Sequence, residues 1–256
     1  MDNKINMKGK RLIAKSIFMT HVRRIGIIRT AFGGGLMYVS ILEFIFLHLT
    51  TIVVLYNWIL APALKLKRYK IRNFIVLDRN RIDRMRMFDR INCLFCGYAN
   101  GTAHLWNIQL DELASASAKK GNIFAKFIGI LYSMLLAVFL ICNFIFSKLL
   151  FLVISAFLGL HWAKTSEIRN KLNEENYAGN FPFLFKKLIR FAKIYAKSLA
   201  TNLEQIESAW CPLTHMKREE ASYPEHHKNF YQWDKLDDVI EVLAKEGTVS
   251  ERKPKY

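Results

Sequence analysis

Two long apolar blocks, at residues 36–64 and 123–162, constrain the fold of this chain more than any other feature of its sequence. The chain has 256 residues, of which 52% are hydrophobic, yet outside these blocks it is polar and mostly basic. A soluble domain of this length spreads its apolar residues over many short periodic segments. Their concentration in two blocks instead predicts helices that cross a membrane.

The first block predicts one membrane span near residues 36–60, which is long enough to cross about 30 Å of hydrocarbon as a helix. We expect the glycine triplet at 33–35 to separate this span from the basic segment before it, and Pro62 to stop or kink it. Glu43 and His48 are ionisable residues within the span and so invite a functional interpretation. We favour the simpler one, a carboxyl near the interface and a neutral histidine packed against a neighbouring helix.

The second block is about twice as long as one crossing requires. At about 1.5 Å per residue, a single helix over it would measure nearly 60 Å. We therefore expect a helical hairpin with its turn around residues 142–148, where Asn143, Ser147 and Lys148 form the polar cluster of the block. No glycine or proline marks this turn. Cys142 is expected to be a small buried apolar side chain.

The chain carries a formal net charge of +17, and its basic residues gather beside the apolar blocks. This placement favours the lipid bilayer and anionic lipid head groups as partners, and a cytoplasmic position for the basic flanks. Nucleic-acid binding is not expected, because no RNA- or DNA-binding motif accompanies the charge. We expect a multi-pass protein of the bacterial inner (cytoplasmic) membrane, for which another membrane protein is a further candidate partner.

The polar part between the blocks, residues 63–122, predicts two helices. The first carries an apolar stripe from Ile82 to Ile91 and delivers Cys93 at its C-terminal end. The stretch 97–101 contains two glycines and is expected to form the turn before a second helix.

The polar part after the second block contains the clearest amphipathic helix of the chain. From Phe183, apolar residues recur at spacings of three and four, and Pro212 should end this helix close to Trp210. A short helix follows, with an apolar face formed by Leu236, Val239, Ile240 and Leu243.

These elements predict an all-α integral membrane protein with one span, a helical hairpin and a small helical cytoplasmic lobe. Its expected segments are a basic amphipathic N-terminal segment at 1–33, a transmembrane span at 34–62, a cytoplasmic helical segment at 63–122, a transmembrane hairpin at 123–162, and a cytoplasmic helix with a C-terminal tail at 163–256.

Four side chains have the types and spacing of one metal site: Cys93 and Cys96 in N-C-L-F-C-G, and Cys211 and His215 in W-C-P-L-T-H. A thiolate pair two residues apart can chelate a soft cation, and three cysteines with one histidine form a closed tetrahedral zinc set. The two pairs can meet only if the block between them returns the chain to the same side of the membrane. Zinc is therefore the expected cofactor, with iron or an iron–sulfur cluster as the alternative.

Other interpretations of these residues are weaker. A thiol redox pair would be expected in a βαβ context, which is missing, and covalent haem attachment is excluded because Gly97 follows Cys96 where a histidine is required. Unrelated buried cysteines stay open as an alternative. The adjacent His226 and His227 can supply an extra metal ligand, but we favour a solvated loop for them. Glu204 and Glu207 are one helical turn apart and could face the metal, but we favour an exposed helical face.

The two motifs resemble those of a family of functionally uncharacterised bacterial membrane proteins, which pairs N-C-x-[YF]-C-x-Y-A-N-G with a later [WYF]-C-P-x-x-H. The matching residues are Asn92, Cys93, Phe95, Cys96, Tyr98, Ala99, Asn100, Gly101, Trp210, Cys211, Pro212 and His215. Relatives keep the two motifs about one helix apart, whereas here the block 123–162 lies between them. The resemblance implies assembly of the four ligands and no particular activity.

The sequence thus predicts an inner-membrane protein that acts as a structural or interaction module and carries a cytoplasmic Cys3His site, for which zinc is the expected metal. The alternative is a membrane-bound metalloenzyme or electron-transfer protein that uses the same site with iron or with open-coordination zinc. Coordination discriminates between them, because a closed four-ligand site indicates structure and an open position indicates chemistry.

Overall fold

A computed structural model describes residues 16–116, 123–158, 183–216 and 218–245 of the chain. Within these ranges the protein is helical, and the only β-type pairing is an isolated bridge between Leu213 and Tyr231. The elements in chain order are α2 (Ile17–Ile25), α3 (Ile27–Val39), α4 (Ile41–Phe46), η1 (Leu47–Leu60), α5 (Ala61–Leu64), η2 (Ile71–Asn73), η3 (Arg79–Arg81), α6 (Met87–Ala116), α7 (Ile123–Leu158), α9 (Phe183–Trp210), η4 (Glu225–Asn229) and α10 (Leu236–Lys245).

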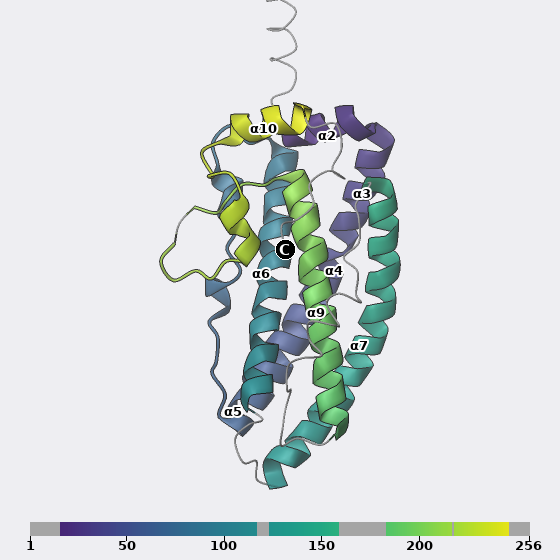
Figure 1. Cartoon of the computed structure of the whole chain (residues 1–256), viewed down its shortest axis with the longest axis vertical. Helices are drawn as coiled ribbons and strands as arrows, with labels where there is room; N and C mark the ends of the chain where they lie inside the picture. Colours follow the sequence, from purple (N-terminus) through teal and green to yellow (C-terminus); the bar gives the residue numbers. More distant parts are fainter. Residues whose placement is uncertain (1–15, 117–122, 159–182, 217, 246–256) are drawn as a thin grey trace, which may run out of the picture.

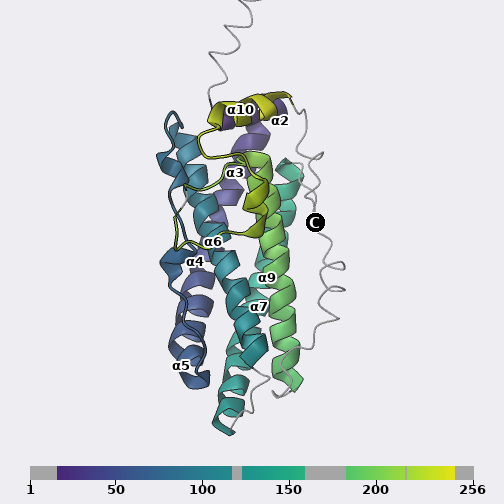
Figure 2. The ribbon, with the colours of Figure 1, turned by 60° about the vertical axis from the view of Figure 1, so that its left-hand side comes forward.

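Four long helical stretches form one elongated bundle, and α2 and α10 lie across one of its ends (Figures 1 and 2). The stretch α3–α5 is parallel to α6, since Phe44 contacts Phe95 and His48 contacts Tyr98. Helix α9 is antiparallel to both: Asn107 of α6 bonds to the Ala196 carbonyl, and Asp111, further along α6, pairs with Lys193, which comes earlier in α9. The helices predicted for a separate lobe therefore share one core with the apolar helices.

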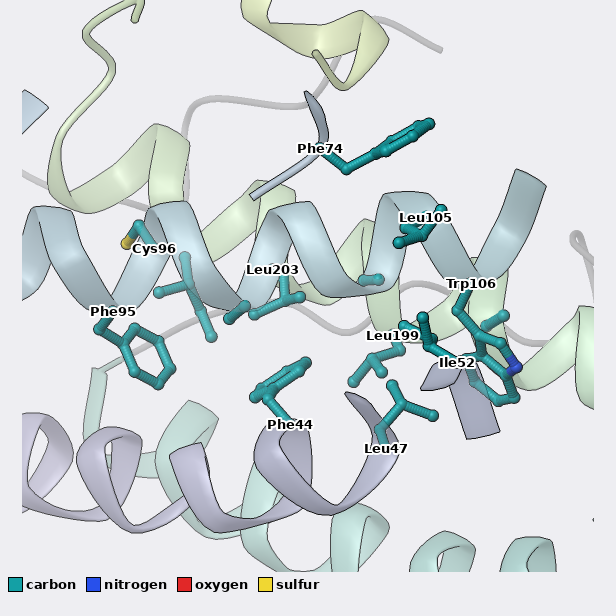
Figure 3. Packing of buried hydrophobic residues seen from close by; sticks show 14 of the residues in the cluster. Phe44, Leu47, Ile52, Phe74, Phe95, Cys96, Leu105, Trp106, Leu199 and Leu203 are labelled. Atoms are coloured by element: carbon teal, nitrogen blue, oxygen red, sulfur yellow. The ribbon is translucent and has the colours of Figure 1, made fainter. Parts of the chain in front are cut away.

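The core of the bundle is built from residues of all four stretches. Figure 3 shows Phe44 and Leu47 of the first stretch, Phe95 of α6 and Leu203 of α9 converging on one side of α6. Phe74, from the segment before α6, packs on the opposite side of that helix. Helix α6 is thus covered on two faces, which explains why so many of its polar residues are buried.

The first apolar stretch begins earlier than predicted. Helix α2 ends at Gly26, whose φ of 87° is readily adopted by glycine and rarely by residues with a side chain. Helix α3 starts at Ile27. The prediction that the glycine triplet at 33–35 separates the span from the preceding segment is wrong, because all three glycines lie inside α3. Pro62 is accommodated one turn before the end, where the helix stops at Lys65 with φ of 53°.

Residues 66–86 return along the outside of α6 in a largely extended segment that includes η2 and η3. The predicted turn at 97–101 is wrong: α6 continues through it, and Cys93 and Cys96 lie inside the helix. Gly97 and Gly101 are one helical turn apart. Because they have no side chain, the backbone of the segment 66–86 can pack directly against α6 at these two positions. A Cβ on Gly97 would lie 2.6 Å from the Val76 carbonyl oxygen, and one on Gly101 would lie 2.5 Å from that of Phe74.

The predicted hairpin at 123–162 is wrong for the part that the structure describes, because α7 is one continuous helix over Ile123–Leu158. Of the polar residues assigned to its turn, Asn143 and Ser147 lie on its buried face and Lys148 is partly buried. Asn143 donates to the Phe139 carbonyl at 3.1 Å, and Ser147 interacts with the buried Glu43–Tyr195 pair. With no glycine or proline to end it, the helix persists. Cys142, predicted to be buried, is exposed on its outer face.

Helices α9 and α10 agree with the predictions. Helix α9 covers Phe183–Trp210 and ends just before Pro212, and its apolar stripe is buried against α6 and α7. In α10 the four predicted apolar residues pack towards α2. In both helices a local amphipathic pattern is sufficient to define the element.

Two helical stretches, Ile27–Leu64 and Ile130–Ile154, are long and apolar enough to cross a membrane by length and composition. Both keep large apolar side chains on the protein surface, for example Leu42, Leu49 and Trp58 on the first, and Met134 and Leu149 on the second. The predicted first span at 36–60 lies within the first stretch.

Candidate metal site

A buried ion pair between Arg79 and Glu207 lies at the α2–α10 end of the bundle. Arg79 belongs to η3 and is 1% exposed, and Glu207, in the last turn of α9, is 0% exposed. The guanidinium contacts Glu207 Oε1 and also donates from Nη1 to the Leu213 carbonyl at 2.9 Å. The pair therefore ties the extended segment to α9 and to the loop after it. The expectation that Glu207 lies on an exposed face is wrong.

The ion pair fixes the charge of both partners. Burial alone would raise the pKa of Glu207, but the Arg79 guanidinium and then His227 outweigh it and hold that pKa well below its usual range. Burial acts against the charged form of Arg79 too, and Glu207 together with the nearby thiols outweighs it and raises the Arg79 pKa. A full negative and a full positive charge thus persist inside the protein.

Three of the four predicted ligands surround this pair. Cys93 and Cys96 are three residues apart on one face of α6, and Cys211 directly follows α9; all three are buried. Because α9 is antiparallel to α6, its C-terminal end brings Cys211 to Cys93, and their thiols share a hydrogen bond. Arg79 acts electrostatically on all three sulfur atoms.

This arrangement makes the thiols unequal. The hydrogen bond from Cys211, and then the Arg79 charge, outweigh burial and lower the pKa of Cys93. The same bond and burial raise the pKa of Cys211, while burial and the Glu207 charge raise that of Cys96. Cys93 is therefore the thiol that ionises first. The thiolate that it forms is the state in which cysteine binds a metal.

The fourth predicted ligand, His215, lies in the loop after Cys211 and is 8% exposed. Its Nδ1 lies 2.5 Å from Asp78 Oδ1, and its ring stacks on Tyr223 with a centroid distance of 5.0 Å. The ring contacts of His215 are thus with Asp78, Tyr223 and His227, and not with the thiols. A carboxylate on Nδ1 leaves Nε2 as the free coordinating atom, as in carboxylate–histidine–metal arrangements.

The structure also assembles a ligand group that the sequence analysis weighed and did not favour. Glu207, His226 and His227 each offer one ligand atom, and these atoms all lie within 4.8 Å of one another. His227 is buried, so the prediction of a solvated loop for both histidines is wrong. The adjacent histidines and the carboxyls one helical turn apart were visible in the sequence, but nothing local indicated that η4 folds back onto the end of α9.

A further buried histidine, His21 of α2, closes the same end of the bundle. Its ring stacks on Trp210 at a centroid distance of 4.2 Å, its Nε2 lies 3.3 Å from the Trp210 carbonyl oxygen, and Arg24 donates to its Nδ1 at 3.4 Å. Burial, and then the Arg24 charge, lower the pKa of His21 to about 3. The neutral ring is therefore part of the folded structure.

Acid should destabilise the protein through this histidine. The folded pKa lies below the unfolded one, so the stabilisation is complete above pH 6.5 and is lost as the pH falls from 6.5 towards 3. Each pH unit in that window costs about 1.4 kcal/mol of unfolding free energy per such histidine. His21→Gln should lose less unfolding free energy between pH 6.5 and pH 4.5 than the unmodified protein, measured by equilibrium unfolding in detergent. Equal pH dependence of the two proteins would contradict the burial of a neutral His21.

No protein-family model matches the chain, and neither the curated proteins nor the solved structures contain a significant match to it.

Proposed function

We propose that the chain is a multi-pass protein of the bacterial inner membrane whose polar end binds one zinc ion through Cys93, Cys96, Cys211 and His215, and that it acts as a structural or interaction module. The contact between Cys211 and Cys93 is the observation that carries the proposal. These residues come from motifs separated by the whole of α7, and the fold nevertheless brings their sulfur atoms together.

The surroundings of the ligands support a metal in two ways. Asp78 orients the His215 ring, which is the usual arrangement for a metal-binding histidine. Three thiolates and a neutral imidazole around Zn²⁺ carry one net negative charge, and such a charge is costly inside a protein. Arg79 lies within electrostatic reach of all three sulfur atoms and offsets that charge while it remains paired with Glu207.

The exposed apolar faces support the membrane part of the proposal. Many large apolar side chains are exposed along α3–η1 and α7, which is unfavourable in water and is typical of a surface that contacts lipid or another protein. The segment 66–86 runs along the outside of α6 and is largely extended, and backbone that is not helical requires water or protein partners rather than lipid. Its basic residues suit anionic head groups.

Removal of single ligands tests the zinc site. The detergent-purified protein is expected to lose about one equivalent of zinc in each of Cys93→Ser, Cys96→Ser, Cys211→Ser and His215→Ala, because a closed tetrahedral site requires all four ligands. Metal content is measured by elemental analysis, and an absorption spectrum of the same sample separates zinc from iron.

Cys142→Ser is the matched control, since this cysteine is exposed on α7, away from the site. It should retain the metal content of the unmodified protein. Full retention of zinc in Cys211→Ser would contradict the shared site, because Cys93 and Cys96 would then hold the metal without their distant partner.

A further inference from the structure

We propose that Glu207, His226 and His227 form a second site for a divalent transition-metal ion, separate from the Cys3His site and with open coordination positions. The proposal goes beyond the structural zinc site and does not depend on it. Two imidazoles and one carboxylate are a ligand set for Zn²⁺ or Fe²⁺ that leaves room for water or a substrate.

The geometry of the three ligands is already convergent. Glu207 Oε2 lies 3.0 Å from His226 Nε2 and 2.8 Å from His227 Nε2, so one carboxylate oxygen faces both rings. All three ligand atoms lie within 4.8 Å of one another, so one ion can be reached by all three. Glu207 comes from the last turn of α9 and both histidines from η4, so the site staples the C-terminal loop onto the bundle.

The neighbours of these ligands orient them as partners of metal ligands usually do. Arg79 holds Glu207 Oε1 and so leaves Oε2 to face the histidines. Glu204, one turn earlier on α9, places Oε2 3.9 Å from His226 Nδ1, the ring nitrogen that points away from Glu207. At this distance the Glu204 carboxylate acts on the His226 ring by charge and not through a hydrogen bond.

His227 presents Nε2 to the Glu207 carboxylate, and its ring is held inside the protein, with the residue 6% exposed. Its other ring nitrogen, Nδ1, points away from Glu207 and is buried with no hydrogen-bond partner among the described residues. Nε2 is therefore the atom that His227 offers to an ion at this site.

Arg79 lies between neighbouring ligand sets and interacts with both. Its guanidinium contacts Glu207 and acts electrostatically on the three thiols. The His215 and His227 rings also lie close together, with centroids 5.2 Å apart. The polar end of the bundle then combines a closed site that stabilises structure with an open one suited to chemistry.

Cobalt(II) titration of the full-length, chelator-treated protein in detergent tests the proposal, because cobalt reports the ligand type. Thiolate ligands give a sulfur-to-cobalt charge-transfer band, and nitrogen or oxygen ligands do not. The unmodified protein should bind about two equivalents, one from each ligand set. His226→Ala with His227→Ala should bind one equivalent fewer and keep the band, whereas Cys93→Ser with Cys211→Ser should lose the band and keep the other equivalent.

The two double variants test the second site and the Cys3His site separately. Unchanged stoichiometry in the double histidine variant overturns the second site, and unchanged stoichiometry in the double cysteine variant overturns the Cys3His site alone. His48→Ala is the control, since His48 bonds to Tyr98 outside both sets. If the alanine variants fail to fold, the asparagine variants replace them. A single equivalent in the unmodified protein, accompanied by the sulfur-to-cobalt band, also overturns the second site.

Discussion

Gly101→Ala is expected to lower the free energy of unfolding by about 3 kcal/mol, at the upper end of the usual cost of overpacking. An added Cβ would lie 2.5 Å from the Phe74 carbonyl oxygen and 2.9 Å from the Ile75 Cα. Both atoms belong to backbone, so no side chain can rotate away to make room. Either α6 or the segment beside it has to move.

The effect should extend from stability to the metal sites. The segment that Gly97 and Gly101 admit continues directly into Asp78 and Arg79, and Arg79 is the residue that joins the two ligand sets. Gly97→Ala should act in the same way, because its Cβ would lie 2.6 Å from the Val76 carbonyl oxygen. We therefore expect both variants to bind less metal as well as to unfold more easily.

Gly35→Ala is the matched control. This glycine also lies in a helix, but its added Cβ meets nothing within 4 Å. Alanine has the higher helix propensity, so the control should be as stable as the unmodified protein or more stable by up to about 1 kcal/mol. Thermal and denaturant-induced unfolding in detergent provides the measurement. Equal stability of Gly101→Ala and Gly35→Ala would contradict the close approach of the segment to α6.

The sequence predicted the elements whose signals are local. The stripe that starts at Phe183 and the proline after Trp210 define α9 without any knowledge of its partners, and the same is true of α10. The first apolar stretch was also predictable, because a helix long and apolar enough to cross a membrane is recognised by length and composition.

The glycines show what local reasoning misses. A glycine can permit a turn or a close approach, and the two uses look alike in a sequence. Gly97 and Gly101 were assigned to a turn, yet they admit a neighbouring backbone one helical turn apart within α6. At Gly26, by contrast, a glycine with positive φ does end a helix. Only the position of the partner segment separates the two cases.

The candidate site shows a similar division. The residue types and spacing of Cys93, Cys96 and Cys211 indicated that these residues belong together, and the fold does bring them to one end of the bundle. The roles of Arg79 and Glu207 could not be predicted, because a charged residue is exposed by default and its burial depends on a partner far along the chain.

Removal of one partner of the Arg79–Glu207 pair is expected to have the largest effect of any single substitution. Arg79→Met should lower the free energy of unfolding by about 3–5 kcal/mol, since it leaves an uncompensated buried carboxylate. The loss also removes the donor to the Leu213 carbonyl, which anchors the loop after α9. Equilibrium unfolding of the chelator-treated protein in detergent measures this cost without a contribution from bound metal.

The double variant Arg79→Met with Glu207→Gln separates the charge from the packing. If the cost arises from the unpaired charge, the double variant should be more stable than the sum of the two single effects predicts, because neither charge remains buried. Arg84→Met is the control: Arg84 pairs with Asp237 at 2.7 Å, but both side chains are about two-thirds exposed, with relative accessibilities of 67% and 70%. Water screens such a pair, so its loss should leave the unfolding transition almost unchanged. An Arg79→Met transition that coincides with the Arg84→Met transition would show that the Arg79–Glu207 pair is not the buried centre of this end of the bundle.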